Sequence, residues 1–227
     1  MNVFVFDLDD TLYEELTYVR SGFHAVARFL QAEKSIPMED TLALMMEELR
    51  VNGRGKVFDQ VLEHYGILSK LLVRRCLQVY RSHRPEIQLY DDARRCLNRL
   101  AHYPIYIVTD GNKHVQLAKL QALGLYDRLP VKRCFITRRY GVHREKPSPH
   151  CFQLICKMEQ VSPDQVVYIG DNPNKDFVGI KPLGFRTVRL LRGNYAQLRK
   201  PKEYEADVVL RSLDELDETV VFRSNEG

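Results

Sequence analysis

A run of four apolar residues near the N-terminus, Val3 to Phe6, constrains the fold more than any other feature of the sequence. Apolar and polar residues do not alternate in this run, so neither face of the segment is suited to water. Short continuous runs of β-branched and aromatic residues are typical of parallel strands that are buried on both faces. Acidic residues follow at once, in the stretch DLDDTLYEE of residues 7–15. The sequence therefore predicts a central strand that delivers carboxylates to one edge of a sheet.

Helix and strand patterns alternate after Pro85. The predicted helices cover residues 91–102, 113–124 and 148–159, and the predicted strands cover residues 104–109, 134–137, 165–170, 185–190 and 206–210. A further short helix is expected after residue 170, between the predicted strands at residues 165–170 and 185–190. Strands that alternate with helices favour a parallel sheet with helices on both faces. We therefore predict a Rossmann-like α/β fold.

Residues 14–84 have a different pattern, because four segments with helical spacing follow one another without a convincing strand. We predict that this stretch is an inserted helical-bundle cap, and that residues 1–13 and 85–227 form the α/β catalytic core. The insertion leaves and rejoins the core at points that are expected to lie close together. It would then form a lid over the carboxyl edge of the sheet, where open α/β sheets bind ligands.

Composition and charge narrow the possible partners. The 34 basic and 30 acidic residues leave a net charge of +4, which is too small and too dispersed to indicate nucleic acid. The densest basic stretch, residues 138–146, is interpreted as a solvated loop. No apolar run approaches the roughly 20 residues that span a bilayer, and the N-terminus lacks the pattern of a signal peptide. Five cysteines without a C-x-x-C pair fit reduced thiols, so we expect a cytoplasmic protein.

Polar side chains that are suited to chemistry follow several of the predicted strands. They are Asp7 and Asp9 after the first strand; Thr109, Asp110 and Gly111 after the second; Lys146 in the loop REKPSPH; and Asp171 and Asp176 after the strand VVYI. Each group by itself is typical of a turn. Their order, with each at a strand end, predicts that they converge at one edge of the sheet. The amides after Thr109 lie at a predicted helix start, which suits an anion.

These motifs resemble those of the haloacid dehalogenase-like hydrolase superfamily, in its phosphatase branch with a helical cap. DLDDT is similar to the first motif, D-x-D-x-T, and Thr109, KPSP and GDNPNKD are similar to the second, third and fourth. The resemblance implies that Asp7 attacks phosphorus and that Asp9 is the general acid and base. It also implies Mg²⁺ as cofactor, held by Asp7, the backbone carbonyl of Asp9 and Asp171. Lys146 would add positive charge at the nucleophile, and Asp176 would hold Lys146 or a metal-bound water.

A cation is also a physical requirement of such a site. Two like charges about 4 Å apart cost roughly 4 kcal/mol at an effective dielectric constant near 20. An aspartate beside other acids therefore cannot readily attack a phosphate dianion, and Mg²⁺ takes hard oxygen ligands of this kind. The other acids are assigned elsewhere: Asp10 to a turn, and Glu14 and Glu15 to a helix start. Asp110 stands where the family often has Asn, so we expect its amide to bind phosphate while its side chain turns away.

The second acid of the first motif indicates the reaction. Dehalogenases of this family carry D-x-Y-G-T, and a carbon–halogen bond needs no proton for its leaving group, so Asp9 favours a phosphatase. The expected substrate is a small phosphorylated metabolite, either a nucleoside monophosphate or a sugar phosphate. A haloacid dehalogenase or phosphonatase of the same fold remains an alternative, as does a non-enzymatic switch phosphorylated on aspartate, or a binding protein.

The predicted cap contains one candidate for substrate contact. Arg54 lies in the glycine-flanked basic loop VNGRGKVF, residues 51–58, between two predicted helices. We expect its side chain to reach toward the leaving group of the substrate. A solvated helix–helix turn is the other interpretation of this loop.

Overall fold

The structure is a computed structural model that describes residues 2–217. The chain divides into two compact units. One unit contains the residues up to Glu15 and those from Gln88 onward, and the other is Leu16–Ile87. The second unit is therefore an insertion in the sequence of the first, placed between its first and second strands.

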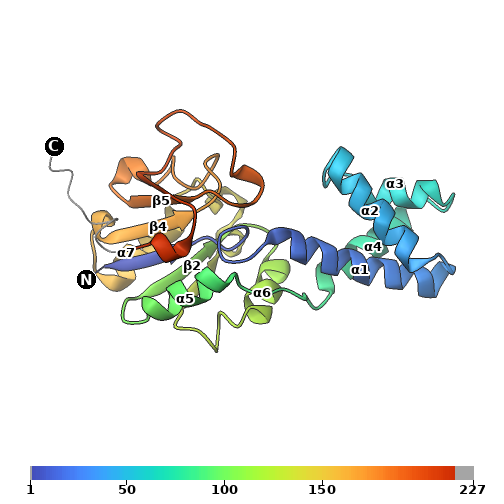
Figure 1. The fold of residues 1–227 in the computed structure, drawn as a ribbon, viewed down its shortest axis with the longest axis horizontal. Coiled ribbons are helices and arrows are strands. Elements are labelled where there is room, and N and C mark those ends of the chain that lie inside the picture. The colour runs from blue at the N-terminus through green and yellow to red at the C-terminus, as the bar shows by residue number, and fades with distance from the viewer. Residues whose placement is uncertain (1, 218–227) are drawn as a thin grey trace. The chain divides into compact units, whose positions relative to one another are not determined.

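The first unit is built on a six-stranded parallel sheet (Figure 1). Its strands are β1 (Val3–Phe6), β2 (Ile105–Thr109), β3 (Arg133–Ile136), β4 (Val166–Gly170), β5 (Arg186–Leu190) and β6 (Val208–Leu210). They lie in the order β3-β2-β1-β4-β5-β6, and every neighbouring pair is parallel. The α-helices of this unit are α5 (Asp91–Arg99), α6 (Lys113–Ala122) and α7 (His150–Glu159). The predicted Rossmann-like α/β fold is confirmed.

Strand β1 is central because all of its side chains avoid water. Each of its four residues is fully buried, and Phe4 pairs with Ile105 of β2 on one side and with Val167 of β4 on the other. Val3 and Val5 pack in one apolar cluster with residues of α7, and Phe4 and Phe6 point to the opposite face of the sheet. Strand order reverses at β1, and ligands bind at such switch points in open α/β sheets.

The segment between β4 and β5 differs from the expected short α-helix. It forms turns and a single 3-10 helix, Lys181–Leu183. Pro182 lacks the N–H group that would continue an α-helix. Gly179 packs so closely against the chain at Pro147 that an added Cβ would lie 1.7 Å from the Pro147 carbonyl oxygen. This contact with another loop therefore sets the local path of the segment.

The second unit contains four helices and its own apolar core. The helices are α1 (Glu15–Lys34, which begins at the last residue of the first unit), α2 (Met38–Asn52), α3 (Val57–His64) and α4 (Lys70–Ser82). Phe23, Met45 and Leu62, from three different helices, belong to one buried cluster. Ser69 caps α4 by accepting a hydrogen bond from the Leu72 amide. Within residues 2–217, no helix combines the length and apolarity needed to cross a membrane.

Asp92, in the first turn of α5, ties together distant parts of the first unit. Its carboxylate accepts hydrogen bonds from Arg192, from the Ser212 hydroxyl (2.9 Å) and from the Leu213 amide (2.9 Å). We expect Asp92→Ala to lower the free energy of unfolding by about 2–3 kcal/mol, because it leaves these donors without their charged acceptor. Urea unfolding at pH 7 measures the change, and Asp91→Ala, an exposed acid in the same turn, is the matched control.

The same interaction has a defined pH dependence. Burial would raise the pKa of Asp92, but the hydrogen bonds from Arg192 and the Leu213 amide outweigh it and lower the pKa to about 2. A depressed carboxyl pKa contributes stability above the unfolded-state value of about 3.9. The difference between the wild type and Asp92→Ala should therefore shrink as the pH falls from about 4 toward 2. An unchanged difference across this range would contradict the assignment.

Candidate active site

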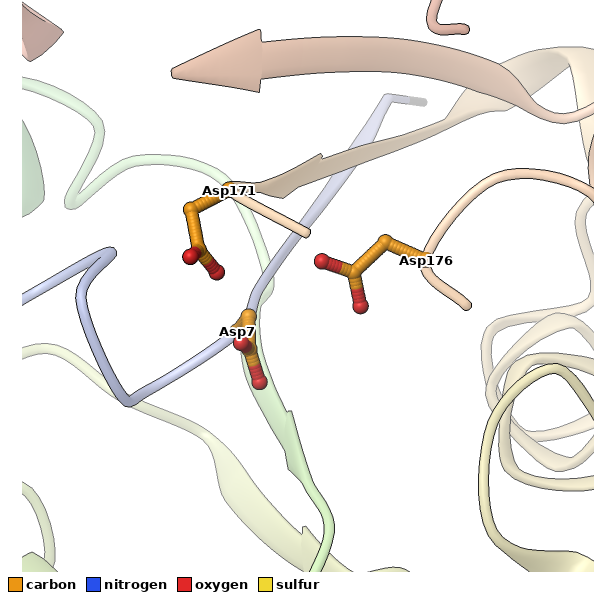
Figure 2. A group of neighbouring side chains, drawn as sticks. All are labelled: Asp7, Asp171 and Asp176. Carbon is orange, nitrogen blue, oxygen red and sulfur yellow. The ribbon is translucent and has the colours of Figure 1, made fainter. Parts of the chain in front are cut away.

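Three carboxylates meet at the carboxyl ends of β1 and β4 (Figure 2). Asp7 directly follows β1, Asp171 directly follows β4, and Asp176 lies in the loop beyond it. All three are buried, and one carboxylate oxygen from each lies within 4.8 Å of the others. The Asp7 amide donates a hydrogen bond to the Ile169 carbonyl (2.8 Å), which continues the β1–β4 pairing and places the two aspartates side by side.

The crowding of these acids shifts their protonation. Burial raises the pKa of Asp7 to about 6; the Lys146 charge opposes this rise, and the Asp176 charge adds to it. Burial also raises the pKa of Asp171 to about 9, and the charges of Asp176 and Asp7 add to the shift. A buried cluster of carboxylate oxygens that resists full ionisation is the donor set that a hard divalent cation stabilises. The site is therefore chemically suited to a metal ion.

Lys146 brings a positive charge into direct contact with Asp7. Its ammonium lies 2.7 Å from Asp7 Oδ1, 2.8 Å from Asp176 Oδ1 and 2.8 Å from the Tyr168 hydroxyl. Burial by itself would lower the pKa of Lys146, but Asp176 and Asp7 raise it well above its ordinary value. The lysine is thus a cation in the resting protein. Asp176 was predicted to hold Lys146 or a metal-bound water, and the structure shows its contact with Lys146.

Tyr168 was not anticipated from the sequence. Its hydroxyl accepts a hydrogen bond from the Lys146 ammonium and donates one of 3.0 Å to the Asp176 carboxylate. The signal in the sequence was weak, because an aromatic residue in an apolar strand is ordinarily packed in the core. Tyr168 also packs edge-on against Phe152 of α7, so its ring belongs to the core and its hydroxyl to the site.

Asp9 contacts helix α6 rather than the three-carboxylate cluster. Lys119 Nζ lies 2.6 Å from its Oδ1, and Gln116 Nε2 lies 2.9 Å from its Oδ2. The Tyr13 hydroxyl donates a third hydrogen bond, of 2.5 Å, to Oδ1. Burial would raise the pKa of Asp9, but Lys119, Tyr13 and Gln116 lower it below its ordinary value. None of these three contacts with Asp9 was predicted from the sequence.

Asp10 makes the turn that the sequence predicted for it. Its φ angle is +54°, in the left-handed region that Asp adopts more readily than most residues. Its carboxylate accepts hydrogen bonds from the amides of Glu15 (2.9 Å) and Asn194 (3.3 Å). Helix α1 begins at Glu15, as expected. The chain therefore turns sharply after Asp9 and enters α1 within five residues.

Thr109 ends β2 and is linked to Asp9 through one side chain. Gln116 Nε2 donates to Thr109 Oγ1 (2.6 Å) as well as to Asp9 Oδ2. Thr109 is buried, and its hydroxyl keeps a proton that it can donate. Asn112 caps α6 by accepting hydrogen bonds from the amides of His114 and Val115.

The two residues after Thr109 are engaged within the protein. The Asp110 carboxylate accepts hydrogen bonds from the Thr137 hydroxyl (2.7 Å), the Lys146 amide (3.1 Å) and Lys175 Nζ (2.9 Å). The Gly111 amide, which we expected at the phosphate, donates to Glu145 Oε1 (3.1 Å). The Asp110 carboxylate thus holds the loop that carries Lys146 in place. Phosphate binding by the amides of Asp110 and Gly111 stays a prediction.

The first unit thus brings together most of the residues predicted for the site. Asp7, Asp9, Thr109, Asp110, Gly111, Lys146, Asp171 and Asp176 all lie at or just beyond the carboxyl ends of its strands. Arg54 belongs to the other unit, in the exposed turn between α2 and α3. Its contact with a substrate stays a prediction.

The fold is that of an α/β protein with a group of charged and polar side chains at the carboxyl edge of its sheet. The sequence matches the model of the haloacid dehalogenase-like hydrolase family over residues 1–184. The chain therefore belongs to the haloacid dehalogenase-like hydrolases, as its motifs predicted.

Relatives within the family differ in their named reactions. The chain is 29% identical over 228 residues to glyceraldehyde 3-phosphate phosphatase of Methanocaldococcus jannaschii, with 95% of each chain covered. It is 30% identical over 166 residues to (S)-2-haloacid dehalogenase 1 of a Pseudomonas species, covering 72% of this chain and 67% of that one. The structure of the hydrolase YfnB from Bacillus subtilis, bound to magnesium, superposes with a TM-score of 0.64 at 21% identity, covering 94% of this chain and 96% of that chain.

Proposed function

We propose that this protein is a Mg²⁺-dependent phosphatase that hydrolyses a small phosphorylated metabolite through an aspartyl phosphate on Asp7. The observation that carries the proposal is the pair of carboxylates in the first motif, each held differently. Asp7 contacts the Lys146 ammonium beside Asp171 and Asp176, whereas Asp9 contacts α6. Two carboxylates in two environments suit a nucleophile and a proton carrier. Relatives named as phosphatases support the same reaction.

The proposed reaction has two steps that balance. Asp9, which its donors hold as an anion in the resting protein, takes up a proton from solvent when the anionic substrate binds. Asp7 attacks phosphorus while the bond to the leaving oxygen breaks, and Asp9 gives that oxygen its proton. A water molecule then attacks the aspartyl phosphate and gives a proton back to Asp9. This hydrolysis releases phosphate and restores both carboxyl groups. The Lys146 ammonium orients Asp7 and offsets the negative charge of the phosphoryl group. Thr109 offers its hydroxyl as a donor to a phosphate oxygen.

The metal that we propose is Mg²⁺. Asp7, Asp171 and the backbone carbonyl of Asp9 would hold it, with Asp176 close by. When bound, it would supply positive charge that screens the carboxylates and the phosphate from one another. The closeness of the three carboxylate side chains supports this assignment, as does the magnesium named for the related B. subtilis structure.

The proposed substrate is a small phosphate monoester, such as a sugar phosphate or a nucleoside monophosphate. The relative from M. jannaschii is named for a triose phosphate, which is of the same class as a sugar phosphate. Dehalogenation is the second candidate, because one relative is named for it. Asp9 argues against it, since a departing halide takes no proton.

Turnover assays on the full chain distinguish these reactions. We expect many turnovers of p-nitrophenyl phosphate with Mg²⁺ and none after treatment with EDTA. A panel of phosphorylated metabolites then ranks the substrates by kcat/KM, and halide release from 2-chloropropionate tests dehalogenation. Halide release without phosphate release would refute the proposal. So would a single phosphorylation of the protein without turnover, which is the signature of a switch.

We further propose that the helical unit, residues 14–84 in the predicted division, selects the substrate through Arg54. Loss of a hydrogen bond to a charged group costs about 1.5–3 kcal/mol, which is tenfold or more in kcat/KM. Arg54→Ala should therefore lower kcat/KM at least about tenfold for the best metabolite in the panel. Arg74→Ala, an exposed arginine in the same unit, is the control. Unchanged kcat/KM for every good substrate of Arg54→Ala would refute this contact.

A further inference from the structure

Three donors occupy the carboxylate of Asp9. Lys119 and Tyr13 share Oδ1, at 2.6 and 2.5 Å, and Gln116 holds Oδ2 at 2.9 Å. Asp9 keeps 23% of its side chain exposed, whereas only 4% of the Lys119 side chain is exposed. The carboxylate therefore faces the accessible side of this pair, and the lysine lies behind it.

Burial of a lysine at this position is unfavourable unless another interaction compensates it. Removing an ammonium group from water is unfavourable by several kcal/mol unless an anion compensates it. Lys119 stands on α6 one turn after Gln116, so the two side chains lie on the same face of the helix. Gln116 in turn bonds to Thr109 at the end of β2. Helix α6 thus fixes Asp9 relative to the strand end that carries Thr109.

We infer that Lys119 is a positioning residue for proton transfer by Asp9. This inference rests on the proposed function, since it requires Asp9 to be the proton carrier. When the bond to the leaving oxygen breaks, the proton passes from Asp9 to that oxygen and the carboxylate becomes an anion. The Lys119 ammonium, 2.6 Å from Oδ1 in the resting protein, keeps this carboxylate in place through the transfer. Gln116 and Tyr13 hold the carboxylate in one orientation, so the proton is delivered at a fixed place.

Leaving-group basicity provides the test. Phenyl phosphate and p-nitrophenyl phosphate have nearly the same shape, but phenolate is the more basic leaving group and depends more on a proton. General acid catalysis contributes about 10²–10⁴-fold. We expect Lys119→Met to lower kcat/KM for phenyl phosphate about 100-fold. The loss of kcat/KM for p-nitrophenyl phosphate should be smaller by a factor of about five or more. A merely structural lysine would affect both substrates equally.

A double-mutant cycle with Asp9→Asn shows whether Lys119 acts through Asp9. We expect Asp9→Asn to lose phenyl phosphate turnover selectively, and the further change Lys119→Met in that background to cost less than about threefold. Lys113→Met, an exposed lysine in the first turn of α6, should match the wild type on both substrates. Thermal unfolding of each variant confirms that it is folded under assay conditions.

The outcomes distinguish the positioning role of Lys119 from the proposed phosphatase activity. Equal losses on both substrates in Lys119→Met, or a full further loss in the Asp9→Asn background, overturn the positioning role and leave the proposed phosphatase intact. If Lys119→Met does not fold, Gln116→Leu takes its place, with the same selective loss expected for the same reason. Absence of turnover by the wild type on either phosphate overturns the proposed function itself.

Discussion

Replacing Asp7 with asparagine is expected to reduce phosphate monoester turnover by about 10⁴-fold or more. An amide oxygen is a far weaker nucleophile than a carboxylate, and loss of a covalent nucleophile typically removes most of the rate enhancement. The change also deprives the buried Lys146 ammonium of an anion that lies 2.7 Å away. Steady-state assays with p-nitrophenyl phosphate and Mg²⁺ measure the loss. Acid quenching with radiolabelled substrate should trap a phosphorylated protein only in the wild type.

Asp10→Asn is the matched control for this experiment. Asp10 lies three residues from Asp7, but its carboxylate bonds to the amides of Glu15 and Asn194 rather than to the site. Asparagine tolerates the left-handed φ of +54° and keeps one acceptor oxygen. We expect Asp10→Asn to retain turnover within a few-fold. Retention of more than about a hundredth of the activity by Asp7→Asn would contradict its assignment as the nucleophile.

Replacing Asp171 with asparagine is expected to abolish stabilisation of the protein by Mg²⁺. A ligand at 100 times its dissociation constant stabilises the folded state by about 2.7 kcal/mol, which raises the melting temperature of a chain of this size by about 5 °C or more. The wild type should show this shift in a thermal melt at pH 8, and Asp171→Asn should show almost none. Asp127→Asn, an exposed acid of the same unit, should keep the full shift.

The metal-free protein should also respond to pH with a definite sign. Burial, with the charges of Asp176 and Asp7, raises the pKa of Asp171 to about 9 in the folded state. A raised carboxyl pKa contributes stability that is complete below the unfolded value of about 3.9 and is lost as the pH rises toward 9. The Mg²⁺ shift of the wild type should therefore grow between pH 5 and 9. Metal-free Asp171→Asn should exceed the metal-free wild type in stability at pH 8; the opposite order would contradict this charge assignment.

Local patterns in the sequence were sufficient for much of the fold. The run Val3–Phe6 was predicted to be a buried strand, and it is one, with all four side chains fully buried. Gly124, expected to close the helix at residues 113–124, follows the end of α6 with a φ of +69°. The segment after β4 was the exception. There, the close approach of Gly179 to the Pro147 carbonyl, a contact between separate loops, leaves only a 3-10 turn in place of the expected helix.

The partners of the site residues were harder to predict than the residues themselves. Asp7 and Asp171 stand at strand ends in recognisable motifs. Lys119, by contrast, lies in an ordinary amphipathic helix, 110 positions away from the Asp9 carboxylate that it contacts. Tyr168 lies 22 positions from the Lys146 ammonium that it contacts. Neither has a local signal, because its polar atom gains a partner only when the chain folds.

The sequence by itself determined the class of fold, the family and the strand ends that carry the predicted chemistry. These follow from hydrophobic period and from motifs a few residues long, which are local properties of the chain. Only the tertiary structure decided which donors of α6 hold the second carboxylate of the first motif: Lys119 and Gln116 at Asp9. Such pairings join residues more than 100 positions apart in the sequence. Their geometry comes from the packing of α6 and the loops against the sheet, which no local pattern encodes.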